Sequence, residues 1–294
     1  MSGDVKGDDM CFANNDENTF HDVTGNETDS TAILDGFIIT AGNANFDVWP
    51  DDGGGGMNNH DGSPTIINCI FKGNSAFADG GGMRTWGDSQ PTIVNCTFIG
   101  NKASQEGGGM MNGPGSKPTI TNCLFRGNST GEDGGGMYNN ESDPLIVNCL
   151  FVENSVKLTG GGMYNVNGST SVVTNCTFVK NSASSGGGMC NTNSNPTLVN
   201  CLFWNNSAEQ NPELFNPGSK PIVTHTLVAG GYGGTGNIDG DPLFADPDMR
   251  LSPGSPCIDA GDNSSVPKAV TTDLDGNPRI INNVVDMGVF EYDE

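Results

Sequence analysis

The sequence is poor in basic side chains. Twelve Lys and Arg residues stand against 35 Asp and Glu residues, which gives a formal net charge of −23 at pH 7. A chain this acidic repels the phosphate backbone of nucleic acids and the headgroups of anionic membranes. Nucleic acid is therefore excluded as a partner.

Long apolar runs, a leader segment and clustered histidines are also missing. No apolar stretch approaches the length of a membrane span, and residues 1–4 begin neither a basic nor an apolar leader. A surface protein needs such a leader, so we expect this chain to be a mature or trimmed form. His21, His60 and His225 are scattered, and no Ser-His-Asp or zinc spacing emerges.

Glycine is abundant, with 44 residues, and much of it belongs to a repeat of 26 or 27 residues. Helices tolerate glycine poorly, so the composition indicates a turn-rich, all-β chain. In each repeat three glycines precede a methionine, an Asn-Cys pair follows, and a phenylalanine and a second asparagine come two and five residues after the cysteine. The repeat cysteines are Cys69, Cys96, Cys123, Cys149, Cys176 and Cys201. Such a period predicts a stacked repeat array.

One repeat contains three short predicted strands. Residues 64–68 form the first, and Asn68 marks a bend because asparagine tolerates left-handed backbone. Period-two alternation then sends Cys69 and Phe71 inward, and the glycines allow a tight turn before the strand that carries methionine inward. The sequence thus predicts an all-β parallel β-helix, a solenoid of about nine three-sided coils.

The domain boundaries follow from the extent of the repeat. We expect degenerate N-terminal coils or a cap over residues 1–52, regular β-helix repeats over 53–235, and a C-terminal capping module over 236–294. In this arrangement the six repeat cysteines form one column. Disulfides or a metal are one interpretation, and a buried ladder of apolar thiols, which in-register stacking favours, is the other.

An acidic stripe is the first candidate site. Asp52, Asp79, Glu106 and Asp133 each directly precede a glycine run, so the coils should stack them along one edge. Stacked carboxylates repel each other by about 1 kcal/mol in bulk water. Either water screens them or a hard cation such as Ca²⁺ bridges them. The sequence therefore predicts a calcium site or a solvated acidic edge here.

A second stripe consists of the outward residues that follow the repeat methionines. It includes Arg84, Tyr138 and Tyr164, with Trp86 close in sequence. Exposed aromatic rings on a β-helix face stack against sugar rings, which predicts a glycan site. The alternative is that ordinary exposed tyrosines fill β positions.

A third stripe consists of the outward residues that follow the repeat cysteines. Four of its six members are aliphatic: Ile70, Leu124, Leu150 and Leu202. Such a row predicts a face that is covered or that self-associates, unless these are simply β-forming residues at strand positions.

Outside the repeats, Asp273, Asp275 and Asn277 have the spacing of part of a calcium loop. The spaced later ligands of a full loop are missing, so an Asp-Gly turn is the favoured interpretation.

The repeats and the C-terminal segment each resemble known families. The triple-glycine and Phe-x-x-Asn pattern of residues 53–206 resembles the repeats of bacterial polymorphic outer-membrane proteins and related right-handed β-helix surface proteins. Residues 241–291 are similar to the C-terminal module of choice-of-anchor β-helix proteins. The resemblance implies a right-handed solenoid, secretion and display on a bacterial cell surface, often with adhesion. Two departures are methionine after the glycines and the lack of a following membrane barrel.

These observations favour an extracellular structural or adhesive module that contacts a polysaccharide or a neighbouring cell surface, with Ca²⁺ as the one cofactor considered. The alternative is a polysaccharide lyase or glycoside hydrolase on the same scaffold. A lyase needs a basic proton abstractor beside a cation or arginine, and a hydrolase needs two facing carboxylates. Neither set is visible in the sequence, so we expect no catalytic residues.

Overall fold

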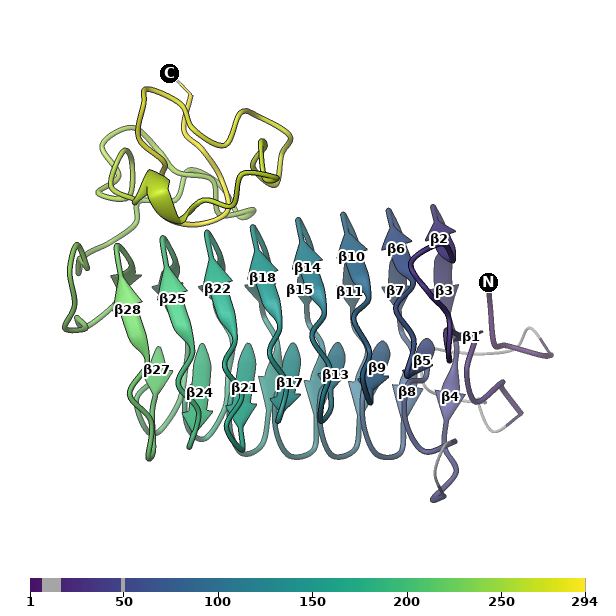
Figure 1. Cartoon of the computed structure of the whole chain (residues 1–294). Coiled ribbons are helices and arrows are strands. Elements are labelled where there is room, and N and C mark those ends of the chain that lie inside the picture. The colour runs from purple at the N-terminus through teal and green to yellow at the C-terminus, as the bar shows by residue number, and fades with distance from the viewer. Residues whose placement is uncertain (7–16, 49–50, 294) are drawn as a thin grey trace.

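The computed structural model describes residues 1–6, 17–48 and 51–293, and it shows a rod of stacked parallel strands (Figure 1). The chain winds as a solenoid, so each strand pairs with the equivalent strands of neighbouring coils. The one helical element among the described residues is a 3-10 turn, η1 (Asn263–Ser265). No described helix is long and apolar enough to span a membrane.

Four sheets form the walls of the solenoid, and each is named here for a feature of its strands. The methionine sheet carries the inward methionines and contains β1 (Val23–Thr24), β5 (Met57–His60), β9 (Met83–Trp86), β13 (Met110–Asn112), β17 (Met137–Asn140), β21 (Met163–Val166), β24 (Met189–Thr192) and β27 (Leu214–Phe215). The proline sheet, whose strands mostly follow a proline, contains β2 (Ile33–Asp35), β6 (Thr65–Ile67), β10 (Thr92–Val94), β14 (Thr119–Thr121), β18 (Leu145–Val147), β22 (Val172–Thr174), β25 (Thr197–Val199) and β28 (Ile222–Thr224).

The other two sheets complete each coil. The phenylalanine sheet contains β3 (Ile38–Thr40), β7 (Ile70–Lys72), β11 (Thr97–Ile99), β15 (Leu124–Arg126), β19 (Leu150–Val152), β23 (Thr177–Val179), β26 (Leu202–Trp204) and β29 (Leu227–Val228). A short sheet contains β4 (Asn43–Ala44), β8 (Ser75–Ala76), β12 (Lys102–Ala103), β16 (Ser129–Thr130) and β20 (Ser155–Val156). The sequence did not predict this short sheet.

The predicted parallel solenoid is confirmed. It has eight strands in each of the three longer sheets, where about nine coils were expected, and the short fourth sheet adds a side to five of the three-sided coils. The bend between the proline and phenylalanine sheets is made as expected. The asparagine before each repeat cysteine has φ between 50° and 54°, in the left-handed region. In-register pairing then places equivalent residues of successive coils directly above one another, as Phe98 lies over Phe71 and under Phe125.

The interior consists of columns of identical side chains. The phenylalanine rings stack with centroids 4.5–4.7 Å apart and are fully buried. The repeat cysteines are buried free thiols, so the interpretation as an apolar ladder is confirmed. Burial raises the pKa of the Cys201 thiol to about 12, which keeps it protonated and unreactive.

Two ladders of asparagine amides run through the same interior. In the first, each Nδ2 donates to the Oδ1 of the next coil over 2.9–3.1 Å, through Asn74, Asn101, Asn128, Asn154, Asn181 and Asn206. The second, with distances of 2.7–2.9 Å, links Asn112, Asn139, Asn165, Asn191 and Asn216. Buried amides need partners, and stacking supplies them from the neighbouring coil.

The C-terminal segment, expected to cap the last coil, lies along the flank of the solenoid instead (Figure 1, yellow). Leu251, Met287 and Val289 pack with Leu150 and Leu202 of the phenylalanine sheet in one buried cluster. Polar contacts fix the docking across a long span of sequence. Asn200 Nδ2 donates to the Asp262 carbonyl over 3.0 Å, and Asn200 Oδ1 accepts from the Asp262 N–H over 2.7 Å.

Candidate functional site

The outward row after the methionines was expected to be exposed, and this prediction is wrong. Arg84, Tyr138 and Tyr164 are only 2%, 5% and 9% exposed, while Trp86 is half-buried. The glycine turn folds back over the row. At Gly134, with φ of 67°, an added Cβ would lie 2.8 Å from Cβ of Tyr138. The tyrosine rings, 5.5 Å apart, therefore pack inside a second small core and do not form a glycan platform.

The Arg84 guanidinium contacts other residues of the chain. Its Nη1 lies 2.7 Å from Asp52 Oδ1, and its Nε donates to Asn58 Oδ1 over 3.1 Å. A guanidinium that is 2% exposed needs such partners, because an unpaired buried charge is costly. Asp52, predicted to bind calcium, is therefore the ion-pair partner of Arg84.

The acidic stripe does stack as predicted. Asp79, Glu106 and Asp133 pair in parallel register in consecutive coils, and all three are half-buried. Burial raises the pKa of Asp79 to about 6. Burial, and then the neighbouring Asp79 carboxylate, raise the pKa of Glu106 to about 7. A fraction of this column therefore carries protons near neutral pH.

The column does not form a ready-made metal site. Among the described residues no group of three or more His, Cys, Asp or Glu side chains is arranged to hold a metal ion. Asp133 Oδ1 accepts from the Thr159 N–H over 2.9 Å and also from the Thr159 hydroxyl. The neighbouring Tyr138 hydroxyl lowers the pKa of Glu106, against the larger effect of burial. Calcium binding at this edge stays a prediction.

The Asp273 loop uses its carboxylate internally. Asp273 is 1% exposed, and Oδ1 accepts from the N–H groups of Asp275 and Asn277 over 3.0 and 2.8 Å. Its Oδ2 accepts from the Glu291 N–H over 3.0 Å. Asp275 pairs with Arg250 over 2.6 Å. This is the Asp-Gly turn that the sequence favoured, and calcium at this loop remains untested.

The row after the cysteines is covered over part of its length. Leu150, Thr177 and Leu202 are at most 3% exposed beneath the C-terminal segment, whereas Ile70 and Leu124 are half-buried. The chain's own C-terminal residues thus occupy half of the row, and self-association along the other half stays a prediction.

An exposed row of uncharged side chains runs along the proline sheet, and the sequence analysis did not single it out. The first residue of each strand points outward, and pairing aligns these residues coil by coil. None is charged, all are half-buried or exposed, and we call them the threonine row: Ile33, Thr65, Thr92, Thr119, Leu145, Val172, Thr197 and Ile222. The sequence signal was present in the recurring Pro-Thr pairs.

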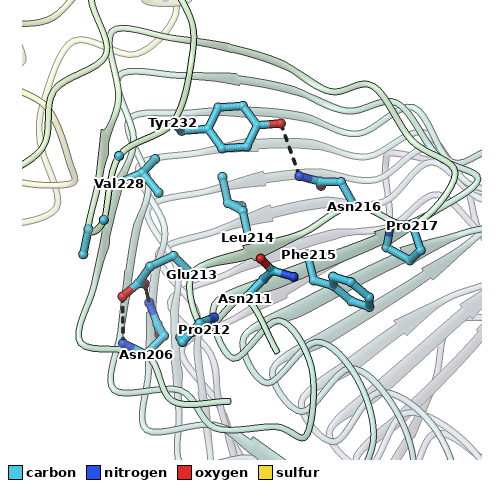
Figure 2. Close-up of a pocket in the computed structure, with 13 residues that line it drawn as sticks. Asn206, Asn211, Pro212, Glu213, Leu214, Phe215, Asn216, Pro217, Val228 and Tyr232 are labelled. Atoms are coloured by element: carbon cyan, nitrogen blue, oxygen red, sulfur yellow. Dashed lines mark hydrogen bonds between the residues drawn. The ribbon is translucent and has the colours of Figure 1, made fainter. Parts of the chain in front are cut away.

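A pocket of about 780 Å³ lies at the C-terminal end of the solenoid (Figure 2). Leu214, Val228 and the ring of Tyr232 form its apolar part. Both amide ladders end here. Asn206 Nδ2 donates to Glu213 Oε2 over 2.5 Å, and Asn216 Nδ2 donates to the Tyr232 hydroxyl over 3.2 Å.

Glu213 replaces the next ladder asparagine at this end. The side chain is buried, and its two oxygens accept from the side-chain amide and the backbone N–H of Asn206. Burial raises the pKa of Glu213 to about 7. Pocket-lining carboxyls with such shifts are candidate functional groups, and the sequence analysis missed this one because it falls where the repeat ends.

A comparison with protein families agrees with this geometry. A family model described as a right handed beta helix region matches residues 59–227, more than half of the chain. The chain belongs to this family. The predicted right-handed β-helix is thus confirmed. No curated protein matches the chain significantly.

The matched region of the β-helix contains the threonine row from Thr65 onward, both amide ladders and part of the end pocket. The C-terminal segment lies outside the match. The polar centre of that segment is Arg279, 1% exposed and 2.7 Å from Glu291, which the sequence analysis did not predict.

Proposed function

We propose that this protein is a non-enzymatic, extracellular rod with a structural and adhesive role on a bacterial cell surface, and that it binds an uncharged glycan. The resemblance of residues 53–206 to polymorphic outer-membrane protein repeats supports the location. The resemblance of residues 241–291 to choice-of-anchor modules supports it as well.

The observation that carries the adhesive role is the threonine row. It is an uncharged strip on a chain with a net charge of −23, and it follows the length of the rod. An acidic surface repels acidic polymers, so an uncharged strip suits a neutral ligand. Exposed β-branched residues include Val172 and Ile222, which are 40% and 61% exposed.

The spacing of the row favours a linear polymer. Neighbouring strands lie about 4.8 Å apart, which is close to the advance of one sugar residue in an extended polysaccharide. A glycan aligned with the rod therefore meets one outward side chain per sugar. Threonine hydroxyls hydrogen-bond to sugar hydroxyls, and the aliphatic members contact the apolar faces of the rings.

The experiment is a co-sedimentation assay with insoluble neutral polysaccharides and a soluble polysaccharide panel. Replacing Thr92 and Thr119 by lysine puts two charges in the middle of the row. We expect binding to fall at least tenfold without loss of fold. The matched control places the same charges at Ser104 and Gln105, two exposed residues away from the proline sheet.

Equal binding by both double variants would remove the threonine row as the contact surface. The same panel tests the alternative function. Release of new reducing ends, or of unsaturated products that absorb in the ultraviolet, would replace the adhesive role with that of a hydrolase or a lyase.

A further inference from the structure

At the last coil of the solenoid, no described strand pairs with the outer edge of β27. Strand β27 is the terminal strand of the methionine sheet and pairs with β24 alone. The proline sheet also stops at its last strand, β28, but Asn237 Nδ2 donates to the Val223 carbonyl at that edge over 2.9 Å. The last strand of the phenylalanine sheet, β29, is extended by a bridge between Leu227 and Ile238. The open edge of β27 borders the end pocket.

The backbone groups of Leu214 face this open side. The Met189 N–H donates to the Glu213 carbonyl over 3.0 Å, so Glu213 is turned toward β24. Successive residues of a strand alternate in direction, and Leu214 is the next one. Its N–H and C=O are therefore presented at the edge of β27, ready to pair with a further strand.

The side chains at this edge have the pattern of an unfinished ladder. In four consecutive coils an inward methionine is followed two positions later by a ladder asparagine, as in Met137-x-Asn139 and Met163-x-Asn165. Leu214 and Asn216 repeat this pattern in the last coil. The Asn216 amide lacks a following asparagine and donates instead to the Tyr232 hydroxyl (Figure 2).

We propose that the open end of the solenoid binds an extended peptide segment of another protein, with the pattern apolar-x-Asn. The segment adds a parallel strand to β27, pairing with the N–H and C=O of Leu214. Its apolar side chain enters the pocket between Leu214, Val228 and Tyr232. Its asparagine takes the place of the Tyr232 hydroxyl on Asn216. Strand addition of this kind obtains affinity from the backbone and specificity from alternate side chains.

Charge and burial define the partner further. Glu209, Glu213 and Asp239 lie around this end, so an acidic segment is disfavoured. The regular coils of a folded second copy offer no such segment, because their inward methionines and ladder asparagines, such as Met137 and Asn139, are fully buried. The occupant is therefore an uncharged or basic segment that is extended or disordered in its own protein.

The probe is a fluorescein-labelled peptide with the sequence of residues 135–140, Gly-Gly-Met-Tyr-Asn-Asn, titrated with the full chain by fluorescence anisotropy. The key variant is Leu214→Pro, which removes the edge N–H at a position where proline is tolerated in an edge strand. Leu214→Val keeps the N–H and is the matched control. Circular dichroism and melting check that both variants fold.

We expect saturable binding to the natural chain and to Leu214→Val, and at least a tenfold loss with Leu214→Pro. A peptide with Asp in place of its first Asn should also bind at least tenfold more weakly. Tyr232→Phe should strengthen binding, because it frees the Asn216 amide. Absence of binding, or equal binding by the proline variant, would overturn the proposal. Dimerisation of the chain alone that is lost in Leu214→Pro would overturn it too, by assigning the edge to a second copy.

Discussion

The regular coils and the C-terminal segment solve the same problem, buried polar groups, in opposite ways. In the coils the amides of the two ladders find their partners in the equivalent asparagine one coil away, as Asn128 does in Asn154. In the C-terminal segment one guanidinium serves several different acceptors. Arg279 pairs with Glu291 and donates to the carbonyls of Asp286 and Gly288 over 3.0 Å.

This difference predicts how sensitive each region is to a single substitution. The first amide ladder distributes its hydrogen bonds over six equivalent asparagines, so each asparagine contributes only part of the ladder's stability. The C-terminal segment concentrates charge, because Arg279 also lies near Asp273 and Asp286. Burial raises the pKa of Glu291, and the Arg279 guanidinium opposes this shift. A single substitution at Arg279 therefore affects the whole segment.

The largest expected effect is that of Arg279→Met. Removing one partner of a buried ion pair typically costs about 3–5 kcal/mol. We expect the C-terminal segment to detach while the coils stay folded. Limited proteolysis with mass spectrometry should then show cleavage within residues 236–294 and protection of the repeats.

Arg250→Met is the matched control for this first prediction. Arg250 also pairs with carboxylates, those of Asp246 and Asp275, but its side chain is 42% exposed. Exposed pairs contribute about 0–1 kcal/mol. Equal cleavage of the two variants would contradict the idea that burial makes Arg279 the centre of the segment.

The next largest effect is that of breaking one amide ladder with Asn128→Ala. The Phe98 carbonyl and Asn154 Oδ1 each lose a buried donor, and Asn101 loses its acceptor. We expect a loss of about 2–4 kcal/mol in the free energy of unfolding, since unsatisfied buried groups cost about 1–3 kcal/mol each. Urea denaturation measures it.

Asn122→Gly is the control from the turn asparagines. Asn122 has φ of 54°, which glycine adopts freely, and the residue is half-buried. We expect a loss below about 1 kcal/mol. A loss as large as that of Asn128→Ala would show that the turn, and not the buried ladder, holds the coils together.

The coils were predictable from the sequence and the C-terminal docking was not, for physical reasons. Period-two alternation fixes which side chains point inward, and in-register stacking repeats that choice in every coil. The columns of Phe71 and Cys69 followed directly. The contact between Asn200 and Asp262 joins residues 62 positions apart and has no period to reveal it.

The candidate sites were harder to predict because local patterns do not specify what covers them. Alternation correctly turned Tyr138 outward, but it contains no information on the glycine turn that packs against Cβ of this residue. Asp273 shows a similar ambiguity. The same Asp-x-Asp-Gly residues make a calcium loop or a hydrogen-bonded turn, and only the N–H groups that surround the carboxylate distinguish them.

A smaller effect is the pH dependence of stability that arises from two half-buried or buried glutamates. Glu213 and Glu106 have pKa values raised from 4.5 to about 7. Between these values the folded chain keeps protons that the unfolded chain has lost, so stability falls as pH rises from 4.5 to 7. Tm should therefore decrease across this window.

Glu213→Gln keeps an acceptor for Asn206 and should flatten the decrease of Tm with pH. Glu209→Gln, an exposed change in the same loop, should not.

The smallest expected effect is that of calcium on the acidic stripe. Excess Ca²⁺ should raise Tm by about 2–4 °C, equivalent to about 1 kcal/mol. The rise should be greater at pH 8 than at pH 6, because Asp79 and Glu106, with pKa values of about 6 and 7, must lose their protons to bind the ion.

Replacing Asp79 by Asn together with Glu106 by Gln should abolish the rise in Tm. The same change at Asp88 and Glu141, two exposed carboxylates, should preserve it. A rise that is independent of pH, or that survives in the first double variant, would place calcium elsewhere and leave the stripe a solvated edge.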